Sequence, residues 1–167
     1  MLHARFTRLM EDPRLRAIII FKNQGERAGA SLTHPHWQLI ATPVVPRLLQ
    51  LEHTVAKEYF DRTGRCLHVV ALEDELASDT RVLAENDAFV AVLPFASHVP
   101  YQVRIQPRAP AASFARLTPS MHGPLATLLK EVLTRLAQAL DNPDFNLTVT
   151  TAPLADQDTR YFVWHID

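Results

Sequence analysis

Apolar and polar positions follow two different spacings along the chain, and each spacing predicts one type of secondary structure. The run "RAIIIFKN" over 16–23 is rich in β-branched residues, which is typical of a buried strand. The segment "HWQLIAT" over 36–42 alternates, which predicts a strand with Trp37 on its apolar face. The same patterns predict strands over 101–107, 145–153 and 160–167, and a hairpin over 80–94.

A spacing of three to four residues predicts helices in the other segments. Residues 47–63 are expected to form one helix, with Gly64 just past its end. Its apolar residues at helical spacing are Leu48, Leu51, Val55 and Tyr59. Residues 117–140 carry the strongest leucine stripe, although their start is open: Thr118-Pro119 is a good cap, whereas Pro124 would interrupt a helix that begins there. Hairpins with one long helix packed on an antiparallel sheet predict the α+β class.

Composition narrows the class of protein without naming a function. The chain has 167 residues, of which 47% are hydrophobic and 21% charged, and its net charge is -1. These values predict a globular protein and favour neither nucleic acid nor an anionic membrane as a partner. The apolar runs are too short to span a bilayer. Cys66 is the only cysteine, so no internal disulfide can form, which fits a cytoplasmic location.

The stretch "FKNQGERAGASLTHPHWQ" over 21–38 gathers polar groups around a glycine-bearing loop. Glycines at 25 and 29 allow backbone amides to approach a ligand, and Ser31 and Thr33 add hydroxyl groups. If residues 34–38 are extended, then His34, His36 and Gln38 share one strand face. An imidazole there can be a nucleophile, a proton shuttle or a metal ligand, or the pair can be a solvated face.

The same stretch resembles the active-site segment of galactose-1-phosphate uridylyltransferases and of their ADP-glucose phosphorylase-like relatives, which are histidine-triad-like proteins. Their pattern is Asn-x-Gly, a Gly-x-Ser turn and His-x-His-x-Gln. The resemblance implies that His36 attacks the α-phosphorus, that Gln38 holds the phosphate and that His34 binds structural zinc. It also implies that the phosphate pocket is lined by Asn23, Gly25, Gly29 and Ser31.

Residues 64–167 resemble the second histidine-triad-like half of that family, so 1–63 would be the end of the first half. Relatives with metal in both halves use Cys-x-x-Cys motifs and histidines. Here Val69 and Val163 stand at two such positions, and Cys66 is expected to be a buried apolar residue. The resemblance therefore predicts no metal site in the second half. No Cys-x-x-Cys precedes His34, which suggests a fragment lacking an N-terminal part.

The resemblance implies an enzyme that moves a nucleoside monophosphate between a UDP-sugar and a sugar 1-phosphate through a His36 adduct. An ADP-sugar phosphorylase is the alternative. A non-catalytic nucleotide-binding remnant and a hydrolase of nucleotidyl bonds are two further hypotheses. A homodimer is implied by resemblance only.

Overall fold

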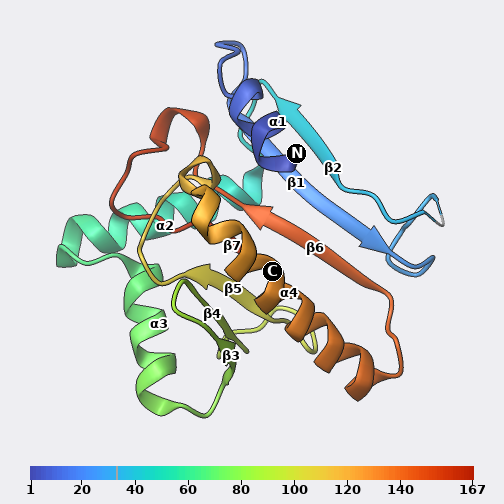
Figure 1. The fold of residues 1–167 in the computed structure, drawn as a ribbon. Helices are drawn as coiled ribbons and strands as arrows, with labels where there is room; N and C mark the ends of the chain where they lie inside the picture. Colours follow the sequence, from blue (N-terminus) through green and yellow to red (C-terminus); the bar gives the residue numbers. More distant parts are fainter. Residues whose placement is uncertain (33) are drawn as a thin grey trace.

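The computed structural model describes residues 1–32 and 34–167, which form one antiparallel sheet with helices on both faces (Figure 1). The seven strands lie in the order β2-β1-β6-β7-β5-β4-β3. The strands are β1 (Ala17–Gln24), β2 (Gln38–Thr42), β3 (Val82–Glu85), β4 (Phe89–Val92), β5 (Arg104–Pro107), β6 (Phe145–Thr150) and β7 (His165–Ile166). The α-helices are α1 (Leu2–Leu9), α2 (Arg47–Thr63), α3 (Leu67–Ser78) and α4 (Pro119–Leu140).

The main core lies between one face of the sheet and helices α1 and α4. Phe6 of α1, with Leu128 and Val132 of α4, packs against strand residues such as Ile20 and Trp164 in one buried cluster. Figure 1 shows α4 crossing the sheet over its central strands. We call this side the first face, and the expected α+β architecture with a long helix on an antiparallel sheet is confirmed.

Helices α2 and α3 cover part of the opposite side, which we call the second face. Alternation along β4 shows the two layers directly, because Phe89 and Ala91 belong to the main core while Val90 and Val92 pack with Leu72 of α3. By the same alternation, Leu147 and Ile166 point to the first face, so their strand neighbours point to the second.

Most predicted elements are present, with shorter bounds. The strand expected over 36–42 begins at Gln38, so the segment before it is not regular strand. Only His165–Ile166 of the segment 160–167 is strand. Helix α4 begins at Pro119 and continues through Pro124, which settles the open start in favour of Thr118 as N-cap. The missing N–H of Pro124 removes only one backbone hydrogen bond.

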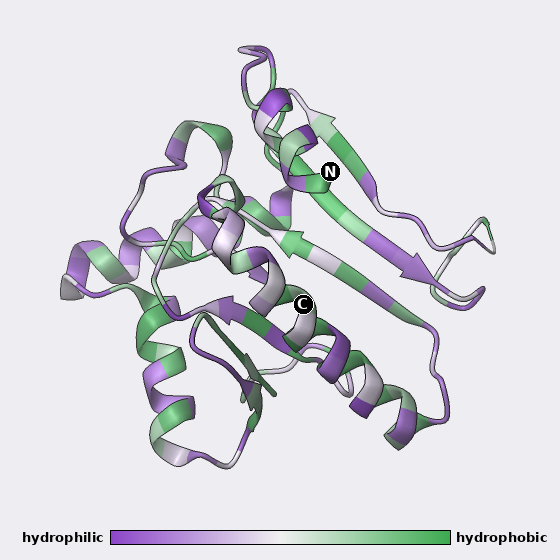
Figure 2. Ribbon diagram, viewed as in Figure 1, coloured by the Kyte–Doolittle hydropathy of each residue, from purple (hydrophilic) through white to green (hydrophobic). Residues whose placement is uncertain are grey.

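Two helical findings differ from the sequence interpretation. Leu67–Val69 forms the first turn of helix α3 and is not extended, so the side chain of His68 turns into the interior. The apolar residues of α2 at helical spacing face outward: Leu48 is 81% exposed and Leu51 59% exposed, whereas Ala56 is fully buried. Figure 2 shows apolar segments on the strands and mixed character along α2.

The two sequence segments share this one sheet. Strands β1 and β2 come from residues before 64, and they join the rest through the pairing of β1 with β6. The division into 1–63 and 64–167 stays a prediction. Among the described residues, no helix combines the length and hydrophobicity needed to cross a membrane.

Candidate functional site

The candidate nucleophile lies in the irregular segment just before β2. His34 is exposed, whereas His36 and Gln38 are half-buried. Nδ1 of His36 lies 2.9 Å from the backbone carbonyl oxygen of His34. Thr33, which the sequence analysis offered as a hydroxyl donor, lies outside the described residues.

The bond between these two histidines sets the tautomer of His36. A carbonyl oxygen can only accept, so Nδ1 carries the hydrogen and donates it. In the neutral ring, Nε2 then keeps its lone pair and is free to attack an electrophile. The hydrogen bond also fixes the direction of the ring. The local backbone therefore provides the orienting group that a nucleophilic imidazole needs.

The glycine loop is a compact turn held by its own amides. The amide of Gly29 donates to the carbonyl of Glu26 (2.9 Å), and that of Ala30 donates to the carbonyl of Gly25 (3.0 Å). Gly25 has φ +87°, a conformation that residues with a Cβ rarely adopt. Ser31 follows the turn and is exposed to solvent. Two of the loop amides thus stabilise the loop itself, and a third, that of Arg27, donates to Asp144 at 2.7 Å.

Asn23 organises this loop from the end of β1. Its Nδ2 donates to the carbonyl of Gly29 at 3.3 Å, and its Oδ1 accepts from Nδ2 of Asn146 at 2.9 Å. One N–H of the Asn23 side chain has no role in these two bonds. Its predicted role in substrate binding stays a prediction, but the structure gives it a structural task as well.

Asn23 and Gln38 lie on the same side of the sheet. Strand alternation places Ile20 and Leu39 on the first face, so Asn23 and Gln38 point to the second face. The second face is open here, because Ile40 of β2 is 47% exposed. The candidate residues from β1, the loop and β2 therefore border one open part of the second face.

A second group of chemically competent side chains is buried under α2 and α3. Glu52, His68 and His165 offer ligand atoms that all lie within 4.8 Å of one another. Oε1 of Glu52 is 3.6 Å from Nε2 of His165 and 4.0 Å from Nε2 of His68. Among the described residues, neither Nε2 has a hydrogen-bond partner. Two buried unpaired nitrogens are costly unless a proton or a cation joins them to the carboxylate.

The electrostatics of this cluster favour neutral imidazoles. Burial, reinforced by His165 and Arg104, lowers the pKa of His68 to about 3. Burial and Arg104 lower the pKa of His165 as well. Arg104 is itself held by two bonds to Asp167, at 2.8 and 2.7 Å, and these bonds overcome burial to lower the pKa of Asp167. Neutral imidazole is the form that binds a metal.

The cluster fits a divalent metal ion. Nδ1 of His165 donates to the carbonyl of Val163 at 3.0 Å, which leaves Nε2 as the ligand atom. Two histidines and one carboxylate are a ligand set that zinc accepts, with ligand atoms about 3.4 Å apart around a tetrahedral ion. The observed spacings of 3.6 and 4.0 Å, with all three ligand atoms within 4.8 Å of one another, would contract around such an ion. The cluster is a possible metal-binding site made of His and Glu.

This cluster was not predicted from the sequence, because its three residues are not spaced as a short ligand motif. Glu52 comes from α2, His68 from α3 and His165 from β7. The expectation that no metal site lies in the second half rested on Val69 and Val163. However, His68 and His165 of that half supply ligand groups. A usable signal was His165 within the apolar run "YFVWHID", since a histidine there needs a partner.

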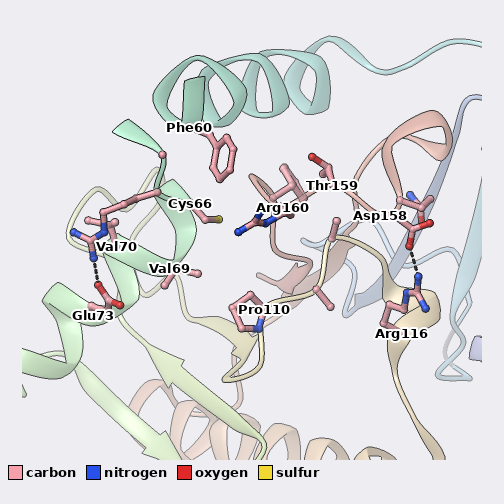
Figure 3. Close-up of a pocket in the computed structure, with 16 residues that line it drawn as sticks. Phe60, Cys66, Val69, Val70, Glu73, Pro110, Arg116, Asp158, Thr159 and Arg160 are labelled. Carbon is pink, nitrogen blue, oxygen red and sulfur yellow. Dashed lines mark hydrogen bonds and ion pairs between the residues drawn. The ribbon is translucent and has the colours of Figure 1, made fainter. Parts of the chain in front are cut away.

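A separate cavity of about 690 Å³ opens beside the start of α3 (Figure 3). Cys66 lies in its wall, together with Phe60, Val69 and Pro110. Cys66 is half-buried, so the expectation of a buried residue is wrong: Cys66 is the N-cap of α3 and borders this open space. None of the candidate residues of the glycine loop, of the segment before β2 or of the buried cluster lines the cavity.

Comparisons with known proteins match nearly the whole chain. ADP-glucose phosphorylase from Arabidopsis thaliana is 35% identical over 164 residues, which are 97% of this chain and 45% of that protein. Galactose-1-phosphate uridylyltransferase from Thermotoga maritima is 27% identical over 152 residues, 90% of this chain and 47% of that protein. The chain is a homologue of galactose-1-phosphate uridylyltransferases and ADP-glucose phosphorylases. No protein-family model matches it.

Solved structures of this group confirm the histidine-triad-like α+β fold. A crystal structure of ADP-glucose phosphorylase from Arabidopsis thaliana with bound ADP-glucose has a TM-score of 0.89 at 31% identity, over 99% of this chain and 52% of that one. A uridylyltransferase structure has a TM-score of 0.92 at 29% identity, over 99% and 52%. The chain spans about half the length of the uridylyltransferase and phosphorylase relatives that it matches.

Proposed function

We propose that this chain carries the nucleophile of a nucleotidyltransferase that moves a nucleoside monophosphate between a nucleoside diphosphate sugar and a sugar 1-phosphate. The observation that carries the proposal is the 2.9 Å bond from Nδ1 of His36 to the carbonyl of His34, since it frees Nε2 for attack. The homologous uridylyltransferases and phosphorylases support the reaction class.

The proposed reaction has two balanced steps. Nε2 of His36 attacks the α-phosphorus of the donor, so an N–P bond forms as the P–O bond to the sugar phosphate breaks. The sugar 1-phosphate leaves, and a second sugar phosphate or inorganic phosphate attacks the same phosphorus, which breaks the N–P bond and restores His36. One pocket can therefore serve two phosphate substrates in turn. Water as the acceptor would give a hydrolase.

The remaining candidate residues would stabilise charge in these steps. Gln38 would donate to a phosphate oxygen, and the hydroxyl of Ser31 would do the same. Gly25 and Gly29 would shape the loop, and Asn23 would offer its remaining N–H. Phosphoryl-type transfer depends on such positioning more than on a strong base.

Zinc binding is the second part of the proposal. Glu52, His68 and His165 would hold one ion, which would act as a cross-link between α2, α3 and β7. The unpaired Nε2 atoms of the two histidines support this assignment. His34, which is exposed, would hold a separate structural zinc together with ligands outside this chain. A homodimer is also proposed, and the outward apolar residues of α2 support it.

The donor is proposed to be UDP-glucose, with ADP-glucose as the second candidate. The 35% identity to ADP-glucose phosphorylase over 97% of the chain favours testing both. The experiment is intact-protein mass spectrometry after separate incubation with each donor, on wild type and His36→Ala. A nucleotidyl increment that appears with one donor and is lost in His36→Ala is expected. An increment that survives in His36→Ala would assign the nucleophile elsewhere.

The remaining alternatives give different outcomes in the same assay. A non-catalytic remnant would bind a donor without any mass increment in wild type. A hydrolase would release free nucleoside monophosphate when no sugar phosphate is present, which chromatography of the reaction mixture detects. His98→Ala is the control variant, because His98 is an exposed loop residue.

A further inference from the structure

The glycine loop of the candidate site is anchored to a distant part of the chain. Strand β1 pairs with β6 so that Asn23 lies opposite Asn146 and Gln24 opposite Phe145. The loop leaves β1 at this point, directly beside the first residues of β6. Residues before β6 can therefore reach the loop although they lie far away in the sequence.

Asn146 donates two hydrogen bonds into the candidate site. Its Nδ2 lies 2.9 Å from Oδ1 of Asn23 and 2.9 Å from the carbonyl oxygen of Ala28. Both N–H groups of this amide are thus used, one on the side chain at the end of β1 and one on the loop backbone. The interaction needs a donor at both bonds, which an isosteric carboxylate cannot supply.

Asp144 holds the opposite side of the loop. Its Oδ2 accepts the backbone N–H of Arg27 at 2.7 Å. The carboxylate also fills the space beside Gly25, where the Oδ1 atom would lie 2.0 Å from an added Cβ. Gly25 is therefore required by the close approach of Asp144 as well as by its own backbone conformation. This interaction needs only an acceptor oxygen.

We propose that Asp144 and Asn146 are positioning residues for the nucleotidyl transfer, which hold the glycine loop in the shape that receives the phosphate. The inference rests on the proposed function for its catalytic consequence. Every candidate catalytic residue precedes residue 64, so the loop would depend on two side chains of the later segment. Amides fixed before the reaction stabilise developing charge without reorganising, whereas a mobile loop would not.

Two isosteric exchanges separate positioning from bulk. Asp144→Asn keeps an acceptor oxygen for Arg27 and should leave the loop intact. Asn146→Asp keeps the shape but removes both donors. Thr148→Ala is the control, because Thr148 lies two residues farther along the same strand on the same face as Asn146. The full chain is used throughout, and thermal melts confirm that each variant folds.

The first readout is the initial rate of nucleotidyl adduct formation with UDP-glucose and with ADP-glucose. Asn146→Asp should slow it by about tenfold or more, because two hydrogen bonds are lost at about fivefold each. Asp144→Asn and Thr148→Ala should stay within about twofold of wild type, which is less than the loss of one such bond. Equal damage by Asp144→Asn and Asn146→Asp would overturn the proposal, as would an unchanged rate in Asn146→Asp.

The second readout is amide hydrogen exchange of Arg27, Gly29 and Ala30, which needs no substrate. Faster exchange of these amides in Asn146→Asp, with β1 and β6 unchanged, is expected. Unchanged loop exchange would overturn the anchoring itself. If wild type exchanges as expected but forms no adduct with either donor, the proposed function fails and the positioning role in that reaction fails with it, while the anchoring is decided separately by the exchange data.

Discussion

Oε1 of Glu52 lies 3.6 Å from Nε2 of His165, which brings a helix that follows β2 against the last strand of the chain. The distance is too long for a good hydrogen bond and short enough for two ligands of one ion. His68 adds a third ligand atom at 4.0 Å from the same carboxylate oxygen. This arrangement of three ligand atoms predicts that the folded protein binds a metal ion, which a measurement of metal content can test.

Divalent metal should stabilise the protein through this cluster. At neutral pH, zinc at about a hundred times its dissociation constant should raise the free energy of unfolding by about 2.7 kcal/mol. Thermal melts of chelated protein with and without added zinc measure the effect. Glu52→Gln should abolish most of the increase, whereas His98→Ala should keep it. An equal increase in Glu52→Gln would place the ion elsewhere.

Acid should destabilise the metal-free protein through His68. Burial lowers the pKa of His68 from 6.5 to about 3. Below pH 6.5 the unfolded chain therefore binds a proton at His68, whereas the folded chain binds it only near pH 3. The contribution of His68 to the free energy of unfolding is therefore fully present above pH 6.5. It falls as the pH drops toward 3, by up to about 1.4 kcal/mol per pH unit.

Denaturant unfolding of chelated protein at several pH values tests this dependence. His68→Leu should flatten the fall between pH 6 and 4, because it removes one titrating group. His165 has a pKa lowered in the same direction, so part of the slope should remain in His68→Leu. A slope identical to that of wild type would show that His68 is not the group responsible.

Gly25→Ala should destabilise the chain more than Gly64→Ala. Both glycines have positive φ, +87° and +72°, so both alanines incur the same type of backbone strain, about 1 kcal/mol. Only at Gly25 does the new Cβ meet the Asp144 carboxylate, and moving that group breaks its bond to Arg27. The extra cost should be about 1–3 kcal/mol.

Denaturant unfolding of both variants gives the two costs. Adding Asp144→Ala to Gly25→Ala removes the clash, so the double variant should lose less stability than the sum of the two single changes. Exact additivity would mean that the two residues do not meet in solution.

The outward face of α2 should drive self-association at high concentration. Leu48, Leu51 and Val55 are 81%, 59% and 45% exposed, and β2 forms an edge of the sheet next to them in the chain. Such a combination favours association. Light scattering of size-separated protein should show mass rising with concentration. Leu51→Lys should reduce this rise, whereas Gln50→Lys, an equal charge away from these residues, should not.

The strand and helix pattern was predictable because each element carries its own spacing. The alternation of β2 correctly placed Trp37 against the main core, and the leucines of 125–140 gave α4. The face of α2 that packs against the protein was not predictable. Its polar residues Glu52 and His53 turn inward toward groups of distant segments, while Leu48 and Leu51 turn outward. The spacing of residues within one helix carries no information on partners that lie far away in the sequence.

Some residues of the candidate site were predictable from the sequence, and others were not. The histidine pair and the glycine loop are contiguous in sequence, so a motif can identify them. Asn146 and Asp144 contact the loop only through the β1–β6 pairing, and His68 reaches His165 only because a helix begins at Leu67. Sequence spacing carries no information on either contact, whereas the register of the sheet does.

The pairing of β1 with β6 also has a consequence for how the protein folds. Strand β1 leaves the ribosome well before β6, which binds it through most of its length. Contacts of such long sequence separation form slowly, because a large loop must close first. The glycine loop can thus acquire its final shape only after β6 has been synthesised.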